Sequence, residues 1–169
     1  EYAVLRKYRN SLLANNNTIE VTDFGAGSKV FKSNTRVISK IAKTAGISPK
    51  RAELLFRITN YLQPDTILEI GTSLGLATSA LSLGSRSVGI KAKIITLEGC
   101  PETAEQAQFQ FENFNLDNVN PIVTEFSSFL GDIQLQTLNF NLIYFDGNHS
   151  KKATLDYFGL LLPTITNET

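Results

Sequence analysis

Residues 66–75 read Thr-Ile-Leu-Glu-Ile-Gly-Thr-Ser-Leu-Gly, and this stretch decides the fold. Its first five residues form a short, mainly apolar run, which is typical of a β-strand that is covered on both faces. Gly71 allows a tight turn and the close approach of a ligand to the backbone, and Gly75 lets the next helix begin close to the strand. A glycine turn of this kind also occurs in α/β proteins of other functions.

Outward from this stretch, apolar strands alternate with helices. Each predicted strand is a continuous apolar run instead of an alternation of apolar and polar residues, as parallel strands covered on both faces usually are. The predicted strands span residues 66–70, 93–97, 121–124 and 141–145, and the predicted helices span about residues 75–84, 101–114 and 151–162. Right-handed crossovers between such elements build a Rossmann-like α/β fold, a doubly wound parallel sheet.

The sequence changes character at Asp65, so residues 1–64 are predicted as a separate helical segment before the sheet. The predicted helices of this segment lie within residues 1–20, 35–45 and 49–62. Ser48 supplies an N-cap for the last of them, followed by a first-turn proline. A glycine-rich stretch at residues 23–29 predicts a flexible turn.

The composition suits one globular domain and argues against several classes of partner. Of the 169 residues, 42% are hydrophobic, which is enough to form a core. Lys plus Arg and Asp plus Glu number 16 each, so the basic excess typical of nucleic-acid binders is missing and no nucleic-acid partner is expected. No signal peptide or membrane-spanning run is recognisable, and the one cysteine, Cys100, cannot form an intrachain disulfide. These features predict a cytoplasmic protein without a membrane partner.

Neither end of the sequence reads as a natural end. The chain contains no methionine, and residues 163–169 read as a connection that leads to a further element. We therefore expect a fragment, with later strands of the sheet lying beyond Thr169.

Ligands of a doubly wound sheet bind at the carboxyl ends of its strands, so the residues that follow each predicted strand form the candidate site. Glu98 follows the second strand, where a carboxylate can accept hydrogen bonds from both hydroxyls of a ribose. Ser127 follows the third strand, and Asp146 and His149 follow the fourth. His149 is the only histidine of the chain, and at such a position a structural role and a functional role are about equally common.

The G-x-G-x-x-G pattern of dinucleotide-binding proteins is absent after the first strand. Ser73 occupies the place of the second glycine, and Leu76 stands where the third glycine belongs. The sequence therefore argues against a loop that cradles a pyrophosphate, and so against a nicotinamide-dependent oxidoreductase. That class stays an alternative, because it uses the same kind of sheet.

Three motifs, in this order, resemble those of class I S-adenosylmethionine-dependent methyltransferases. They are Leu68-Glu69-Ile70-Gly71-Thr72-Ser73-Leu74-Gly75, then Thr96-Leu97-Glu98, then Phe145-Asp146-Gly147-Asn148-His149. The sequence is most similar to the O-methyltransferase-like branch that includes catechol and caffeoyl-CoA O-methyltransferases, and its Asp-Gly-x-His is similar to a subset of that branch. The resemblance covers about residues 65–162.

The resemblance implies that S-adenosylmethionine is the cofactor and that it lies along the carboxyl edge of the sheet. It implies that Glu69 and the backbone of residues 71–75 hold the methionine part, that Glu98 binds the ribose and that Ser127 lies near the adenine. The residues expected to bind the cofactor are Glu69, Gly71, Thr72, Ser73, Gly75, Glu98, Gly99, Ser127 and Asp146.

The resemblance also implies a metal and a lid. In the metal-dependent members, the residue that matches Asp146 is a Mg²⁺ ligand and residues after a fifth strand complete the site, so Mg²⁺ is a candidate second cofactor. Residues 1–64 resemble the helical lid of this group, and residues 65–169 resemble its cofactor-binding core, C-terminally incomplete here.

The implied function is methyl transfer from S-adenosylmethionine to a small-molecule acceptor, with an oxygen as the expected nucleophile. His149 and Asp146 are the candidate catalytic residues, because a hydroxyl acceptor must lose its proton to a base or to a metal-bound group. The alternatives are a methyltransferase-like protein that binds the cofactor without catalysis and the oxidoreductase. A homodimer is the default expectation for the assembly.

Overall fold

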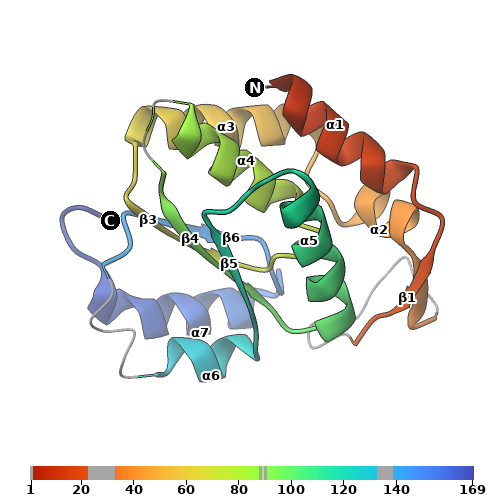
Figure 1. Ribbon diagram of the computed structural model, residues 1–169. Coiled ribbons are helices and arrows are strands. Elements are labelled where there is room, and N and C mark those ends of the chain that lie inside the picture. Colours follow the sequence, from red (N-terminus) through yellow and green to blue (C-terminus); the bar gives the residue numbers. More distant parts are fainter. Residues whose placement is uncertain (1, 23–32, 88, 90, 133–138) are drawn as a thin grey trace.

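The structure, a computed structural model, describes residues 2–22, 33–87, 89, 91–132 and 139–169. Its centre is a four-stranded parallel sheet in the order β5-β4-β3-β6 (Figure 1). The strands are β3 Thr66–Ile70, β4 Lys93–Glu98, β5 Val119–Val123 and β6 Leu142–Phe145. The predicted Rossmann-like parallel sheet is thereby confirmed. The glycine-rich stretch at residues 23–29 lies outside the described residues.

The strand order reverses between β3 and β6. From β3 the chain adds β4 and then β5 on one side, and it then returns to place β6 on the other side of β3. The connections that leave the carboxyl ends of β3 and β6 therefore diverge, which makes this point the topological switch point of the sheet. The sequence places the candidate site at this edge.

Helices cover both faces of the sheet (Figure 1). On one face lie α1 Tyr2–Leu13, α2 Ile38–Thr44, α3 Pro49–Leu62, α4 Leu76–Arg86 and α5 Pro101–Asn113. On the other lie α6 Phe126–Leu130 and α7 Lys151–Leu161, followed by a short 3₁₀ helix at Leu162–Thr164. A separate hydrophobic core lies on each face of the sheet, and successive strand residues point alternately into one core and the other. Ile67 packs with the first group of helices and Leu68 with the second.

Helix α4 is enclosed by its neighbours. Its residues from Leu76 to Ser85 are all buried, which small side chains make feasible between the sheet and α3. A Cβ built on Gly84 would come 2.6 Å from the carbonyl oxygen of Phe56 in α3, so the two helices meet backbone to backbone there. This tight packing holds the C-terminal part of α4 against α3.

Helix α3 begins as its sequence predicts, and α7 has the same kind of start. The Ser48 hydroxyl accepts a hydrogen bond from the backbone N–H of Arg51 at the start of α3, and Pro49 follows in the first turn. Ser150 caps α7 in the same way, through the N–H of Ala153.

The structure differs from the prediction in three short elements. Strands β1 Thr18–Glu20 and β2 Thr35–Val37 pair antiparallel. The periodicity predicts the end of one helix at the first of these strands and the start of another helix at the second. β-branched residues favour the extended chain there, and three-residue strands are too short to show a period of their own. The third element is α6, a helix of five residues in a stretch for which the sequence predicts neither a helix nor a strand.

The N-terminal helices share a core with the sheet. Leu5, Tyr8 and Leu12 of α1 are buried in the same cluster as Ile67 of β3 and Ile94 of β4. The division at residue 64 and the role of residues 1–64 as a lid stay predictions. Across the described ranges, the structure contains no helix with both the length and the apolar character needed to traverse a membrane.

Candidate functional site

The candidate site lies where the ends of β3 and β6 meet. The backbone N–H of Asp146 donates to the carbonyl oxygen of Ile70 at 2.8 Å, so the parallel pairing continues to the last residue before each turn. Gly71 and Gly147 follow directly, and their backbones are in contact. A side chain on Gly71 would overlap the opposite chain, which explains why this position needs glycine.

The turn at residues 71–75 is held against β4. The backbone N–H groups of Gly71 and Thr72 both donate to the carbonyl oxygen of Leu97, at 3.0 and 2.9 Å. Within the turn, Gly71, Ser73 and Gly75 have positive φ angles of 105°, 48° and 75°. This left-handed geometry turns successive peptide groups in different directions, and it brings the chain from β3 into α4 within a few residues.

Glu98 connects this turn to the end of β4. One carboxyl oxygen, Oε2, accepts the backbone N–H of Ser73 at 2.7 Å, and the other, Oε1, accepts that of Cys100 at 3.0 Å. Burial raises the pKa of Glu98, while hydrogen bonds from the backbone of Cys100, Ser73 and Gly99 act in the opposite direction. A carboxylate offers about four acceptor positions, so these two bonds leave room for further donors from a ligand.

Glu69 lies beneath the turn and is fully buried. Its Oε2 accepts hydrogen bonds from the hydroxyls of Thr78 and Thr96, the latter at 2.6 Å, and the Thr96 hydroxyl also contacts that of Thr72 at 2.6 Å. Its Oε1 has no hydrogen-bond partner. Burial raises the pKa of Glu69 to about 8. The hydrogen bonds from the two threonine hydroxyls act to lower this pKa, and the nearby Asp146 and Glu98 carboxyls act to raise it. The group is therefore largely protonated at neutral pH.

A small pocket opens beside the turn. Ala45 and Gly46, from the connection between α2 and α3, form one wall, and Ser73 and Leu74 of the turn form another. Asp146, directly after β6, also lines the pocket. The pocket therefore lies at the switch point of the sheet and is bordered by one acidic residue.

Asp146 and His149 lie together after β6. Burial raises the pKa of Asp146 to about 6, although the charges of His149 and Arg51 act in the opposite direction. His149 itself is exposed. A carboxyl group with a pKa close to neutrality can exchange protons at physiological pH, which suits it to act as a general base.

The structure therefore brings most of the predicted site residues to one edge of the sheet. Hydrogen bonds or adjacency in the chain connect Glu69, residues 71–75, Glu98 and Gly99. Asp146 lines the pocket beside the turn. Their roles in binding or catalysis stay predictions.

Ser127 is placed differently. It lies exposed on α6, where it and Ser128 donate hydrogen bonds to the Glu125 carboxylate and lower the pKa of that group. Its predicted place beside an adenine stays a prediction.

Two features of the site had no signal in the sequence. The phenol of Tyr8, in α1, donates to the carbonyl oxygen of Leu74 in the turn at 3.0 Å, across 66 residues of sequence. The second feature is the pair of hydroxyls, from Thr78 and Thr96, that donate hydrogen bonds to the buried carboxyl group of Glu69. Helical periodicity predicts that Tyr8 is buried, but nothing in the sequence indicates which carbonyl it reaches.

Metal-binding side chains are not clustered within the described residues. Within them, no three or more His, Cys, Asp or Glu side chains are grouped so that they could hold one, and this includes the surroundings of Asp146. The assignment of Asp146 as a Mg²⁺ ligand stays a prediction.

Comparison with known families gives one match. A family model described as a methyltransferase domain matches residues 68–169, which is more than half of the chain. No curated protein matches the chain.

Solved structures give further matches. The SAH-bound Podospora anserina methyltransferase PaMTH1 is 21% identical, with a TM-score of 0.70 over 98% of this chain and 58% of its own. The O-methyltransferase from Bacillus cereus in complex with SAH is 26% identical, with a TM-score of 0.64 over 73% of this chain and 55% of its own. The O-methyltransferase TomG from Streptomyces achromogenes, in complex with SAM, is 22% identical, with a TM-score of 0.61 over 72% of this chain and 53% of its own. The chain thus spans little more than half the length of these proteins.

Proposed function

Because the chain belongs to the family of methyltransferase domains, we propose that it binds S-adenosylmethionine and transfers the methyl group to an oxygen of a small-molecule acceptor. The Bacillus cereus structure, an O-methyltransferase with SAH bound, supports the choice of cofactor and of acceptor atom. The observation that carries the proposal is the Glu98 carboxyl group, which is hydrogen-bonded to the glycine turn at the switch point.

The site fits a nucleoside at Glu98. Its carboxyl group is oriented by the N–H groups of Ser73 and Cys100 and retains acceptor capacity, so the two hydroxyls of a ribose can donate to it. Gly99 keeps the backbone beside it free of a side chain. We place the adenine toward the end of β5, in the direction of Ser127.

The glycine turn fits the methionine part. Gly71 and Gly75 present backbone without side chains, and Thr72 and Ser73 lie between them beside the pocket. Glu69 is fully buried, so we propose that it acts on the turn from below, through the hydroxyls of Thr96 and Thr72. Its unpartnered Oε1 marks a place in the core where one polar contact is still open.

Catalysis in this proposal depends on positioning and on proton removal. When bound, the cofactor supplies an electrophilic sulfonium methyl group. The pocket holds the acceptor oxygen in line with that methyl group, and such orientation can lower a barrier by about 7–11 kcal/mol. Asp146 takes the proton of the acceptor hydroxyl, and His149 lowers the pKa of Asp146 and so favours the ionised base. An alternative within the same site is that His149 itself takes the proton.

The proposal is tested by following a labelled methyl group. The protein is incubated with methyl-labelled S-adenosylmethionine and a panel of small phenols and alcohols, each paired with the corresponding amine. Label on hydroxyl acceptors, lost in Asp146→Asn, is the expected result. Label on amines alone would contradict the oxygen assignment. Tight cofactor binding without transfer to any acceptor would instead favour a cofactor-binding protein without catalysis.

A further inference from the structure

We propose that Tyr8 is a positioning residue for the glycine turn at residues 71–75, so that helix α1 sets the cofactor affinity of the site. The inference rests on the proposed function, because the ligand of the turn is the proposed cofactor. The observation behind it is the hydrogen bond from the Tyr8 hydroxyl to the carbonyl oxygen of Leu74, at 3.0 Å.

This hydrogen bond is shielded from water at both ends. Tyr8 is 0% exposed and Leu74 is 2% exposed. Burial, with the nearby Glu69 carboxyl as a second cause, raises the pKa of Tyr8 well above its usual value, so the phenol keeps its proton. It can therefore donate this hydrogen bond at neutral pH. Without it, the buried carbonyl group of Leu74 would have no hydrogen-bond partner among the residues that the structure describes.

The bond fixes the orientation of one peptide group in the turn. In a trans peptide the C=O and the N–H point in opposite directions. With the Leu74 carbonyl directed to Tyr8, the N–H of Gly75 faces the other way and donates to the carbonyl oxygen of Thr72 at 2.9 Å. This contact closes the turn and sets the start of α4, whose first residues, Leu76 and Ala77, line the pocket.

The packing around Gly75 is built for this contact. A Cβ at Gly75 would come 2.4 Å from the Tyr8 hydroxyl oxygen and 2.4 Å from Cε1 of Phe111 in α5. Glycine at this position thus has two causes, its positive φ angle and the close approach of the phenol. The turn and α1 are fitted to each other.

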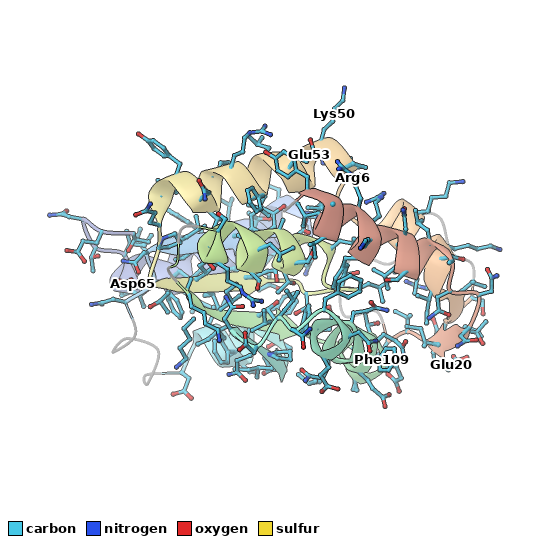
Figure 2. The ribbon with its side chains drawn as sticks, turned by 45° about the horizontal axis from the view of Figure 1, so that its top comes forward. Arg6, Glu20, Lys50, Glu53, Asp65 and Phe109 are labelled. Atoms are coloured by element: carbon cyan, nitrogen blue, oxygen red, sulfur yellow. The ribbon has the colours of Figure 1, made fainter. Side chains whose placement is uncertain are left out.

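Other contacts hold α1 in place independently of this hydroxyl. The ring of Tyr8 packs against that of Phe114, with the ring centroids 5.0 Å apart. Nη1 of Arg6 in α1 lies 3.7 Å from Oε1 of Glu53 in α3. Figure 2 shows these two side chains beside each other on the outer surface. The Ser11 hydroxyl donates to Oε1 of Gln110 in α5 at 3.1 Å. Removing only the Tyr8 hydroxyl should therefore leave α1 docked and change the turn alone.

The test compares Tyr8→Phe with two matched variants of the same helix. Tyr2→Phe removes a phenol that contacts Arg57 on the surface, and Ser11→Ala removes a hydrogen bond from α1 to α5. We expect Tyr8→Phe to weaken SAH binding about tenfold by calorimetry, whereas both matched variants stay within about twofold of wild type. In turnover, Tyr8→Phe should raise the KM for S-adenosylmethionine and leave kcat nearly unchanged. Equal weakening by Ser11→Ala would overturn the inference, because a general loosening of α1 would then explain the result.

Amide hydrogen exchange without any ligand separates this inference from the proposed function. Tyr8→Phe should speed exchange at residues 72–76, and Tyr2→Phe should not. Unchanged exchange at these residues would overturn the positioning role, whatever the protein binds. Faster exchange together with a wild-type protein that binds neither SAH nor S-adenosylmethionine would support the ordering of the turn by Tyr8 and contradict the proposed function.

Discussion

Gly71 and Gly147 face each other across the switch point so closely that a Cβ built on Gly71 would lie 2.5 Å from the backbone nitrogen of Gly147. The two residues follow β3 and β6, the strands between which the order of the sheet reverses. Their contact brings the turn at residues 71–75 next to Asp146. The turn that we propose for the cofactor and the carboxyl group that we propose for proton transfer are joined at this pair.

Gly71→Ala should destabilise the protein by roughly 3 kcal/mol or more, because the added methyl group overlaps the backbone of the facing strand end. Gly89→Ala is the matched control: Gly89 also has a positive φ angle, 81°, but a Cβ there would meet nothing within 4 Å. We expect this control to cost about 1–2 kcal/mol, from the backbone angle alone. Urea unfolding measures both, and equal losses would show that the contact across the switch point contributes nothing.

The stability of the protein should fall as the pH rises from about 6 to 8, because of Glu69. Burial raises its pKa in the folded state to about 8, far above the ordinary value of 4.5. In this window the folded protein holds a proton that the unfolded chain has released, so stability decreases by up to about 1.4 kcal/mol per pH unit. Above the folded pKa the loss is complete.

Glu69→Gln cannot ionise and should flatten this dependence, as measured by urea unfolding at several pH values. The matched control is Glu105→Gln, at an exposed position of α5, which should keep the wild-type slope. A wild-type free energy of unfolding that is constant or rising between pH 6 and 8 would contradict the burial of a protonated Glu69.

Asp146→Asn should lower kcat by about 10²–10⁴ and change cofactor affinity little, because general-base catalysis contributes in this range. The wild-type kcat should rise with pH through a midpoint near 6, where the Asp146 carboxyl ionises, since burial raises its pKa to about 6. Steady-state kinetics between pH 5 and 8 test both statements. A wild-type profile that is flat across this range would exclude Asp146 as the base.

His149→Ala should move that midpoint to higher pH, because the charge of His149 acts to lower the pKa of Asp146. Loss of most of the activity at every pH would instead identify His149 as the base. Unchanged turnover and an unchanged midpoint would remove His149 from the mechanism.

Much of the fold could be predicted from the sequence, because it depends on local patterns. The run at residues 66–70 is apolar and continuous, and β3 spans the same residues. Ser48 caps α3 in the way that its sequence position indicates. The antiparallel pair of β1 and β2 was not predictable, because each strand has three residues and is stabilised by its partner 15 or more residues away.

For the site, the sequence indicates which residues end the strands but not how they are held. Glu98 lies at the predicted strand end, yet its bonds to Ser73 and Cys100 depend on how two separate turns approach each other. Tyr8 reaches Leu74 only because α1 packs across α4, a tertiary contact that has no periodicity in the sequence. The part of the site that depends on long-range packing therefore became visible only in the structure.

The central claim, a cofactor site that depends on Glu98, is tested most directly by calorimetric titration of SAH and S-adenosylmethionine into the wild-type chain, Glu98→Gln and Glu105→Gln. An amide in place of the carboxylate loses one of the two backbone hydrogen bonds and part of its capacity for ribose hydroxyls. We predict that the wild type and Glu105→Gln bind both ligands and that Glu98→Gln binds them on the order of tenfold to a hundredfold more weakly. Binding that is equally tight in Glu98→Gln, or absent in the wild type, would contradict the claim.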